Sequence, residues 1–379
     1  MRVVMLSSLG EHCGVAAYTQ ALVGELAPWA QVELAGYPPL GSGRKRAAAA
    51  RRVAAHDVAH VQYHPDYCGC WRSPLRLLRF WAFLRRIRVP RVVTAHDVFL
   101  PLARRPLGRG GFKAFAHNVA LRPLLNSTGL GRSFRGRFLA AADHVIVHSK
   151  GVRECLEELG IPSGRLSVLY PGIPDLPPVG SYSLRRERRW QDRRLVTVFG
   201  FVTPQKDYEA VLDAVDGMPR RVVVVIAGGA RTVDHEKHAR ALRDRIATGP
   251  LRERAIITGY LDDVSAAAVL RESDAIVLPY RPTGQSGTSY ALSLALAAER
   301  PVVASDTPYF REIAEGHGAI SVYGPGGLKE ALARALARGG QEPAEARAFR
   351  EEWRWKRVAQ RTHEIYETAL SGSHGDPAR

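Results

Sequence analysis

The sequence predicts an α/β protein of two domains, each built on a parallel sheet that helices cover on both faces. The chain has 379 residues, which suits two domains of roughly 100 to 200 residues each. Short apolar runs alternate with helical stretches along its whole length, a pattern typical of βαβ units. The alternation breaks in Ile173–Asp192, where proline, glycine and charge gather. We therefore expect a domain linker at that segment.

The first half contains six strand candidates, each a short and mainly apolar run. They are Arg2–Ser7, Val32–Ala35, Asp57–Tyr63, Arg91–Ala95, His144–His148 and Leu166–Tyr170. Between them the spacing of apolar residues predicts helices over Val15–Ala27 and Gly151–Leu159. The basic, glycine-containing segment Leu100–Phe138 is expected to be a loop or a broken helix near the ligand site.

The second half repeats the pattern with five further strand candidates, again short and apolar, as in a sheet covered on both faces. They are Leu195–Phe199, Val222–Ala227, Ala255–Thr258, Ala275–Leu278 and Val302–Ala304. The last helical stretch, Ala344–Leu370, is longer than one more crossover needs. We expect residues 1–178 and 193–345 to form the two domains, and helix 346–370 to brace the first of them.

The composition places limits on the class of protein. Apolar residues make up 46% of the chain, enough for a packed core. No run approaches the roughly 18 to 20 apolar residues of a membrane-spanning helix, and the start lacks a signal-peptide pattern. We therefore expect a cytoplasmic protein. The cysteines are too few and too irregularly spaced for a disulfide framework or a zinc site. They are Cys13, Cys68, Cys70 and Cys155.

The formal charge of +17 would normally suggest an anionic partner, whether nucleic acid, membrane or phosphorylated substrate. Only seven of the 54 basic residues are lysine, an arginine bias that coding composition alone can produce. We expect no nucleic-acid partner. Trp71–Arg88 carries four aromatic residues among six arginines. This segment is either an amphipathic helix packed on a sheet or a contact with the inner face of an anionic membrane.

Several common sites are absent from the sequence. It has no GxxxxGK[ST] phosphate loop, no GxSxG nucleophile turn and no HExxH metal site. Gly284–Gly287 resembles a nucleophile turn, but Thr288 stands where a closing glycine is needed. No two aspartates stand two positions apart, so a metal-bound nucleotide is not expected. We expect neither a metal nor a cofactor, and phosphate would have to be met by backbone dipoles and cations.

Three segments offer such groups. A turn with two glycines follows the first strand, and Gly14 and Val15 open the next helix, so their N–H groups can approach a ligand. In Gly200–Glu209, a lysine, Lys206, stands at the start of a helix. The alternative interpretation is that Lys206 is simply a solvent-exposed side chain.

The third segment is the most specific of the three. Leu278–Tyr290 runs from a strand through a glycine-containing loop to an Ala/Leu-rich helix. This order would aim the amides of Ser286, Gly287 and Thr288 at an anion. A diphosphate would fit such a loop.

Taken together and in order, these segments resemble the GT-B glycosyltransferases, specifically the retaining family 4 type. The resemblance is carried by the glycine turn at Gly10–Tyr18, Val93–Asp97, Val145–Ser149, Tyr170–Gly172, Gly200–Lys206, Ala227–Gly229, Thr258–Tyr260 and Leu278–Asp306. It implies two Rossmann-like domains facing each other across a cleft, with the acceptor on the first domain and the nucleotide sugar on the second. Hinge motion would close the cleft on the ligand.

Two departures from the family pattern concern the donor. Phe201 stands where relatives often have arginine, which leaves Lys206 as the remaining phosphate-facing cation. The family's paired glutamates align with Ser286 and Leu294. A leucine cannot accept a hydrogen bond from the donor ribose, so the identity of the donor stays open.

The resemblance implies transfer of a sugar from a UDP- or GDP-linked donor, with retention of anomeric configuration and without metal, to a small-molecule, glycan or lipid-linked acceptor. The implied catalytic residues are His96 and Lys206. The alternative interpretation of His96 is a histidine that packs in the core or caps a helix. Donor-binding residues would be Gly14, Val15, Gly200, Phe201, Gly228, Tyr260, Leu261, Ser286, Gly287 and Thr288, and acceptor contacts His12 and His64.

Two other readings stay open: a non-catalytic GT-B-like binding or partner protein, and a membrane-surface enzyme that uses a lipid acceptor. The enzyme reading predicts that Lys206→Ala lowers turnover by roughly 100-fold. We expect this substitution to leave the fold intact, because a lysine beside a cleft contributes little packing.

Overall fold

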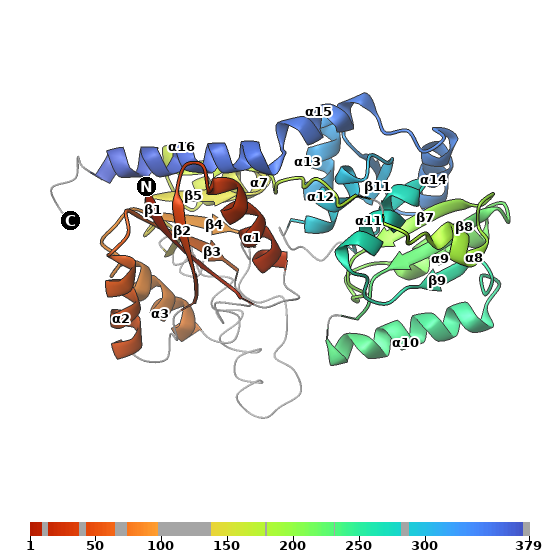
Figure 1. The fold of residues 1–379 in the computed structure, drawn as a ribbon, viewed down its shortest axis with the longest axis horizontal. Coiled ribbons are helices and arrows are strands. Elements are labelled where there is room, and N and C mark those ends of the chain that lie inside the picture. Colours follow the sequence, from red (N-terminus) through yellow and green to blue (C-terminus); the bar gives the residue numbers. More distant parts are fainter. Residues whose placement is uncertain are drawn as a thin grey trace. The chain divides into compact units, whose positions relative to one another are not determined.

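The computed structural model describes residues 1–9, 14–37, 43–64, 74–97, 138–178, 180–230, 232–281 and 288–373. The chain divides into two compact units (Figure 1). The first comprises Met1–Pro171, Gln285–Thr288 and Trp355–Arg379, and the second Gly172–Gly284 and Ser289–Arg354. The predicted segment Leu100–Phe138 lies outside the described residues except for its last one.

The sheet of the first unit has six parallel strands in the order β2-β1-β3-β4-β5-β6. In spatial order the strands are β2 (Gln31–Gly36), β1 (Arg2–Ser7), β3 (Val58–Tyr63), β4 (Arg91–Ala95), β5 (His144–Val147) and β6 (Leu166–Val168). Strand β1 pairs with β2 on one side and β3 on the other, so the order of the strands reverses between β1 and β3. All six are among the predicted strands.

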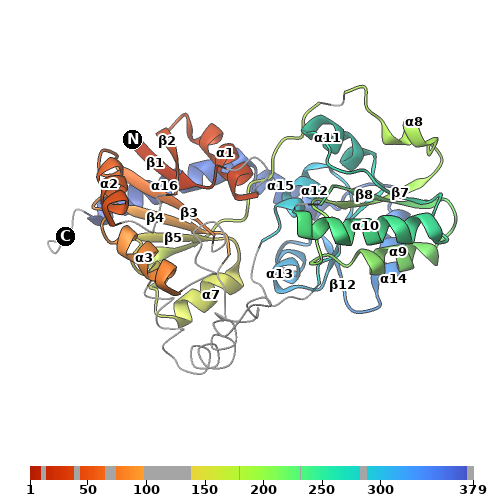
Figure 2. The ribbon, with the colours of Figure 1, turned by 90° about the horizontal axis from the view of Figure 1, so that it is seen from below.

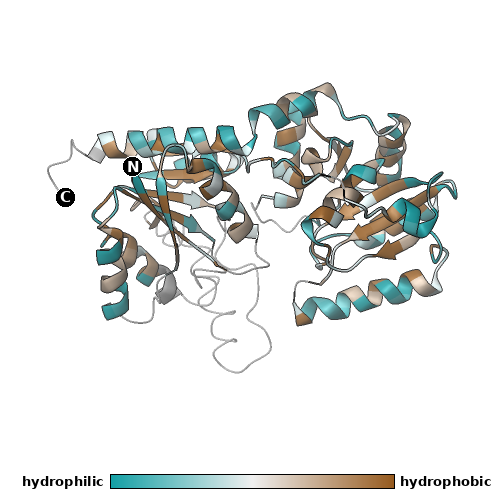
Figure 3. Cartoon of the chain, in the orientation of Figure 1, coloured by the Kyte–Doolittle hydropathy of each residue, from teal (hydrophilic) through white to brown (hydrophobic). Residues whose placement is uncertain are grey.

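Helices cover both faces of this sheet (Figures 1 and 2). They are α1 (Gly14–Leu26), α2 (Gly43–Val53), α3 (Pro74–Leu84), α7 (Lys150–Glu158) and α16 (Trp355–Ser373). Apolar side chains of α2, α3 and α7 form one core with alternate residues of the strands, such as Val61 and Val93. Helices α1 and α16 lie against each other, and α16 also contacts β4. Figure 3 shows the apolar strands and the mixed, two-sided character of the helices, as expected for elements with one buried face.

The second unit has its own sheet of six parallel strands, in the order β12-β11-β10-β7-β8-β9. They are β12 (Ser321–Tyr323), β11 (Val302–Ser305), β10 (Ala275–Leu278), β7 (Arg194–Phe199), β8 (Val222–Ala227) and β9 (Ala255–Ile257). The chain builds β7 to β9 outward on one side and then β10 to β12 on the other. The strand order therefore reverses between β7 and β10.

Five of the eight described helices of the second unit begin with a side-chain cap. The eight are α8 (Leu184–Arg188), α9 (Tyr208–Asp216), α10 (Val233–Thr248), α11 (Asp263–Glu272), α12 (Tyr290–Ala297), α13 (Pro308–His317), α14 (Leu328–Ala337) and α15 (Ala344–Glu352). The side chains of Asp207, Asp262 and Thr307 accept hydrogen bonds from the first turns of α9, α11 and α13, and so satisfy backbone donors that have no partner within the helix. The two Rossmann-like sheets confirm the predicted fold class.

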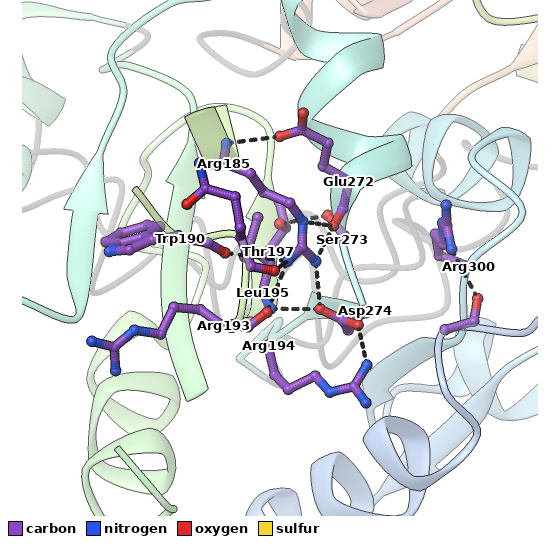
Figure 4. Close-up of polar contacts among 12 residues, drawn as sticks. Arg185, Trp190, Arg193, Arg194, Leu195, Thr197, Glu272, Ser273, Asp274 and Arg300 are labelled. Atoms are coloured by element: carbon purple, nitrogen blue, oxygen red, sulfur yellow. Dashed lines mark hydrogen bonds and ion pairs between the residues drawn. The ribbon is translucent and has the colours of Figure 1, made fainter. Parts of the chain in front are cut away.

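The segment predicted as a linker is largely part of the second unit, and that prediction is wrong for most of its length. Leu184 and Trp190 are buried in a core with Leu195 and Val225. The guanidinium of Arg185 binds the Asp274 carboxylate at 2.7 Å, and it also donates to backbone carbonyls of neighbouring segments (Figure 4).

The predicted helical stretch Ala344–Leu370 is two helices, α15 and α16, with a break at Trp353 and Arg354. The Trp353 carbonyl accepts a hydrogen bond from the Ile173 amide, and the Arg354 guanidinium binds Asp175. The chain is therefore diverted at this point by backbone pairing, which amphipathic spacing does not reveal. None of the described helices is long and apolar enough to cross a membrane.

Candidate active site

In an open parallel sheet, ligands bind beyond the carboxyl ends of the strands where the strand order reverses. In the second unit this place lies beyond Phe199, the last residue of β7, and Leu278, the last residue of β10. The loops that follow these strands pair with each other through an antiparallel bridge between Lys206 and Tyr280. The fold thus brings Lys206 to the position where a ligand is expected.

Lys206 is buried there, with an exposed fraction of 4%. Its Nζ donates a hydrogen bond to the Phe199 carbonyl at 2.6 Å and lies 5.8 Å from the centre of the Tyr280 ring. Burial disfavours the ammonium and lowers the pKa of Lys206 to about 7. The reading of Lys206 as a solvent-exposed side chain is therefore wrong.

The same burial corrects the expectation that Lys206→Ala leaves the fold undisturbed. Alanine would open a space under the loop and remove the donor to the Phe199 carbonyl. Both changes destabilise a protein. A substitution that preserves the volume of the side chain is needed to test its chemistry.

Two glycines allow the loops beyond β7 and β8 to approach each other. Gly200 has a φ of 98°, and a Cβ there would lie 2.9 Å from Nζ of Lys206. A Cβ on Gly228 would lie 2.2 Å from the Gly200 carbonyl oxygen, a distance that backbone atoms cannot relieve by a rotamer change. Gly228 is therefore required by contact with rigid backbone, and Gly200 by its positive φ, which other residues rarely adopt.

The remaining donor candidates of the second unit line the same edge of its sheet. Phe201 is partly buried, and its carbonyl accepts a hydrogen bond from the Tyr208 hydroxyl at 2.9 Å. Tyr260 follows β9 and has an exposed fraction of 62%, whereas Leu261 beside it is partly buried. An exposed tyrosine ring at the end of a strand is suited to stacking against a planar ligand group.

The glycine-containing loop ahead of α12 is only partly described. Ser286 and Gly287 lie outside the described residues, as does His12 of the first unit. Thr288 is partly buried and directly precedes Ser289, the N-cap residue of α12. The Ser289 hydroxyl lies 2.9 Å from the hydroxyl of Tyr280, the residue that forms a bridge with Lys206.

In the first unit, His96 directly follows β4 at the carboxyl edge of the sheet. Its Nε2 lies 2.8 Å from Oε1 of Gln62, and its Nδ1 lies 3.2 Å from Nε2 of His148. Burial, with further contributions from neighbouring histidines, holds the pKa of His96 well below its usual value. Both ring nitrogens therefore have protein partners, and the ring is neutral.

The other candidates of the first unit lie near the reversal of its strand order. His64 follows β3 and is partly buried. Gly14 is the first residue of α1 and is exposed, and Val15 beside it is buried. A Cβ on Gly14 would have no neighbour within 4 Å, so the described surroundings do not require glycine there.

Sequence reasoning missed Gln62, His148 and Tyr280 as parts of these sites. Gln62 and His148 are polar residues within or beside strands that are otherwise buried and apolar. A buried polar residue in a strand is a usable signal, because burial requires a hydrogen-bonding partner. Tyr280 follows directly after Pro279 and carries no comparable signal.

Two family models match the chain in sequence. Residues 13–175 match the model described as Glycosyltransferase Family 4, and residues 192–339 match the model described as Glycosyl transferases group 1. No curated protein matches the chain at a significant level.

Solved structures with similar folds cover nearly the whole chain. The Anabaena protein Alr3699/HepE in complex with UDP and glucose aligns with a TM-score of 0.70 at 16% identity, over 97% of this chain and 100% of its own. Sucrose-phosphate synthase from Thermosynechococcus elongatus aligns with a TM-score of 0.67 at 15% identity, over 98% and 100%. A glycosyltransferase from Rickettsia africae aligns with a TM-score of 0.64 at 13% identity, over 97% and 98%.

The two family matches fall on the two Rossmann-like units, one on each, and the architecture is that of the structures just named. The chain therefore belongs to the glycosyltransferases of the GT-B fold.

Proposed function

We propose that this glycosyltransferase uses a nucleoside diphosphate sugar, UDP-linked or GDP-linked, and that Lys206 binds the diphosphate. The observation that carries the proposal is a buried lysine at the strand-order reversal of the second sheet, with a backbone carbonyl as its hydrogen-bond partner. In the part of the chain that the structure describes, no carboxylate forms an ion pair with this lysine, so an anion at this place would supply a counter-charge. The structural relative Alr3699/HepE has been solved with UDP and with UDP-glucose, which favours UDP as the first nucleotide to test.

The chemistry of sugar transfer suits these groups. As the bond to the sugar breaks, negative charge builds on the departing diphosphate, and a positioned cation in a water-poor site stabilises that charge. Lys206 would act with the amides of Ser286, Gly287 and Thr288. The exposed ring of Tyr260 would stack on the base, and His96 would contact the transferred sugar.

The finer details of the reaction also form part of the proposal. Transfer proceeds with retention of anomeric configuration and without a divalent metal. The acceptor is a small molecule, a glycan or a lipid-linked group, and His12 and His64 would contact it. The reaction takes place in the cytoplasm. The anomeric configuration of the product, followed by proton NMR from an α-linked donor, tests retention. A product of inverted configuration would contradict it.

Thermal shifts test the choice of donor most directly. We expect UDP or GDP, and one of their sugars, to raise the melting temperature, because a ligand of the folded state stabilises it. Lys206→Met should abolish most of that shift. Release of nucleotide from the stabilising sugar would show catalysis, whereas a shift without any turnover would favour a non-catalytic binding protein. No shift with any nucleoside diphosphate would overturn the proposal.

A second proposal concerns peripheral contact with an anionic membrane, as a lipid acceptor would require. Helix α2 carries five basic residues and no acidic one, and Arg79, Arg85, Arg86 and Arg88 on and after α3 are exposed. The aromatic part of the membrane reading is wrong for Phe80 and Phe83, which are buried in the core. Contact would therefore be electrostatic.

Vesicle flotation tests this second proposal. We expect binding to phosphatidylglycerol vesicles that is lost at high salt, and no binding to phosphatidylcholine vesicles. Replacing Arg44, Arg51 and Arg79 by glutamine should weaken binding. Replacing three exposed arginines of the second unit, Arg240, Arg334 and Arg338, by glutamine is the matched control. Equal binding to both kinds of vesicle would contradict the proposal.

A further inference from the structure

One face of the first sheet carries polar side chains where a purely apolar layer would be expected. These are buried residues of β3, β4 and the end of β5, on the side of the sheet opposite to the core formed with α2, α3 and α7. They are His60, Gln62, Thr94 and His148. Because buried polar groups need partners, the positions of their protons can be worked out from the hydrogen bonds.

The proton positions can be assigned first at the end of the network nearest β6. Nδ1 of His148 lies 2.7 Å from the Leu169 carbonyl oxygen, which can only accept, so Nδ1 carries a proton. Burial lowers the pKa of His148 to about 4, so the ring is neutral and Nε2 has only a lone pair. Nδ1 of His96, 3.2 Å away, must therefore donate to it.

The direction continues through His96. Since this ring is also neutral, its Nε2 has a lone pair and accepts. The partner 2.8 Å away is the side-chain amide of Gln62. Only the NH₂ end of an amide can donate, so the amide must be turned by a half-turn that directs its nitrogen to His96 and its oxygen to His60.

The half-turn exchanges a weak bond from the Gln62 NH₂ group to the Met5 sulfur, at 3.5 Å, for an acceptor facing His60. Nδ1 of His60 lies 2.6 Å from the Tyr366 hydroxyl on α16, and its Nε2 lies 2.7 Å from Thr94 and 3.3 Å from the Gln62 amide. If Tyr366 donates to Nδ1, then Nε2 carries the proton and donates to Thr94 and to the turned amide. The opposite direction would leave a bare His148 Nδ1 facing the Leu169 carbonyl.

We infer that these groups form a one-way chain of hydrogen bonds, from the Tyr366 hydroxyl to the Leu169 carbonyl, that fixes the proton of His96 on Nδ1. Gln62 and His148 are then positioning residues for His96. Because the Gln62 amide already occupies the single lone pair of His96 Nε2, a sugar hydroxyl would have to replace that amide to donate there, and a phosphate oxygen has no proton to donate. That last consequence rests on the proposed function, whereas the position of the proton does not.

Nitrogen NMR of protein labelled with ¹⁵N-histidine tests the inference. Protonated and bare ring nitrogens have well-separated shifts, and histidine in water prefers the Nε2–H form, so the Nδ1–H form would be diagnostic. His96→Asn identifies the His96 signals by their loss. We expect Nδ1–H for His96 in the unliganded protein, and an Nε2–H signal or a charged ring would overturn the inference.

Two variants test the role of His148. His148→Phe keeps a ring but removes the acceptor, so His96 should lose its pure Nδ1–H signature and gain the Nε2–H form. His144→Phe removes another buried histidine of the same strand, one that contacts Ser167, and should leave His96 unchanged. An unchanged His96 signature in the folded His148→Phe protein would refute the positioning role. Should that variant not fold, the tautomer of the unmutated protein still decides.

Discussion

The two ends of the second sheet differ in whether their buried charged groups have partners of opposite charge. At the amino end, where β7 and β10 begin, the Asp274 carboxylate receives Arg185 at 2.7 Å, Arg194 at 2.9 Å and the amide of Leu195 at 2.8 Å (Figure 4). At the carboxyl end, the one hydrogen-bond partner of Lys206 within the described segments is a backbone carbonyl, that of Phe199. Among the described residues, no carboxylate lies within 4 Å of its Nζ.

This difference separates a structural role from a binding role. The charges at the amino end are satisfied by the protein and stabilise the fold. The ammonium at the carboxyl end is desolvated, with a pKa lowered to about 7, so keeping it charged costs a few kcal/mol. Because the folded state gives up this proton more readily than the unfolded state, this destabilisation is full below pH 7 and fades as the pH rises toward 10.5. A bound anion would remove it.

The largest effect at the carboxyl end should come from Gly228→Ala. Its Cβ would lie 2.2 Å from the Gly200 carbonyl oxygen, so the loops beyond β7 and β8 must separate. We expect a loss of about 3 kcal/mol in the free energy of unfolding, together with loss of nucleotide binding. Gly316→Ala, where a Cβ has no neighbour within 4 Å, is the control in the same urea titration. Equal stability of the two variants would contradict the close approach of the loops.

Lys206→Met should separate chemistry from packing. Methionine fills a similar volume without the charge, so the fold should be retained while turnover falls by roughly 100-fold. Lys206→Ala should lose turnover and also about 2 kcal/mol of stability. Turnover beside a melting curve checks both variants. Near-normal turnover of the methionine variant would remove Lys206 from the donor site.

Arg185→Met should have the reverse profile at the amino end. Loss of its bonds to Asp274 and to several carbonyls should lower the free energy of unfolding by about 2 kcal/mol. The loss is not larger because Arg194 still pairs with the carboxylate. Nucleotide affinity should not change. The exposed Arg188→Met is the matched control. A large change in nucleotide affinity without loss of stability would break the distinction between the two ends.

The smallest expected effect is that of chelation. If Lys206 and backbone amides meet the diphosphate, EDTA should leave turnover unchanged, since no metal carries the charge. Activity that EDTA abolishes and Mn²⁺ restores would show that the protein's own cation is insufficient.

Much of the fold could be predicted because buried parallel strands are short apolar runs. Arg2–Ser7, Arg91–Ala95 and Val222–Ala227 have the predicted bounds. Strand β12 was missed, because its three residues are exposed or only partly buried and form no apolar run. Helix α8 was missed because the buried residues in and after it, Leu184 and Trp190, stand among arginines that resemble a linker.

The position of the candidate site could be predicted from the sequence, but the burial and hydrogen-bond partners of its residues could not. A lysine at the start of a helix indicated where phosphate would be met, but its burial depends on Tyr280 and Phe199, which lie on other segments of the unit. The partners of His96 were not foreseen either. Gln62 and His148 reach it across neighbouring strands, and strand pairing is a property of the sheet and not of local spacing.

Calorimetric titration of UDP at pH 8, in two buffers of different ionisation enthalpy, tests the central claim most directly. With a pKa of about 7, Lys206 is mostly neutral at this pH, and a bound diphosphate should restore its proton. We expect net proton uptake when UDP binds. The Lys206→Met protein should show no such uptake and should bind UDP more weakly. UDP binding of equal affinity in both proteins, without proton uptake, would show that the buried lysine does not bind the diphosphate.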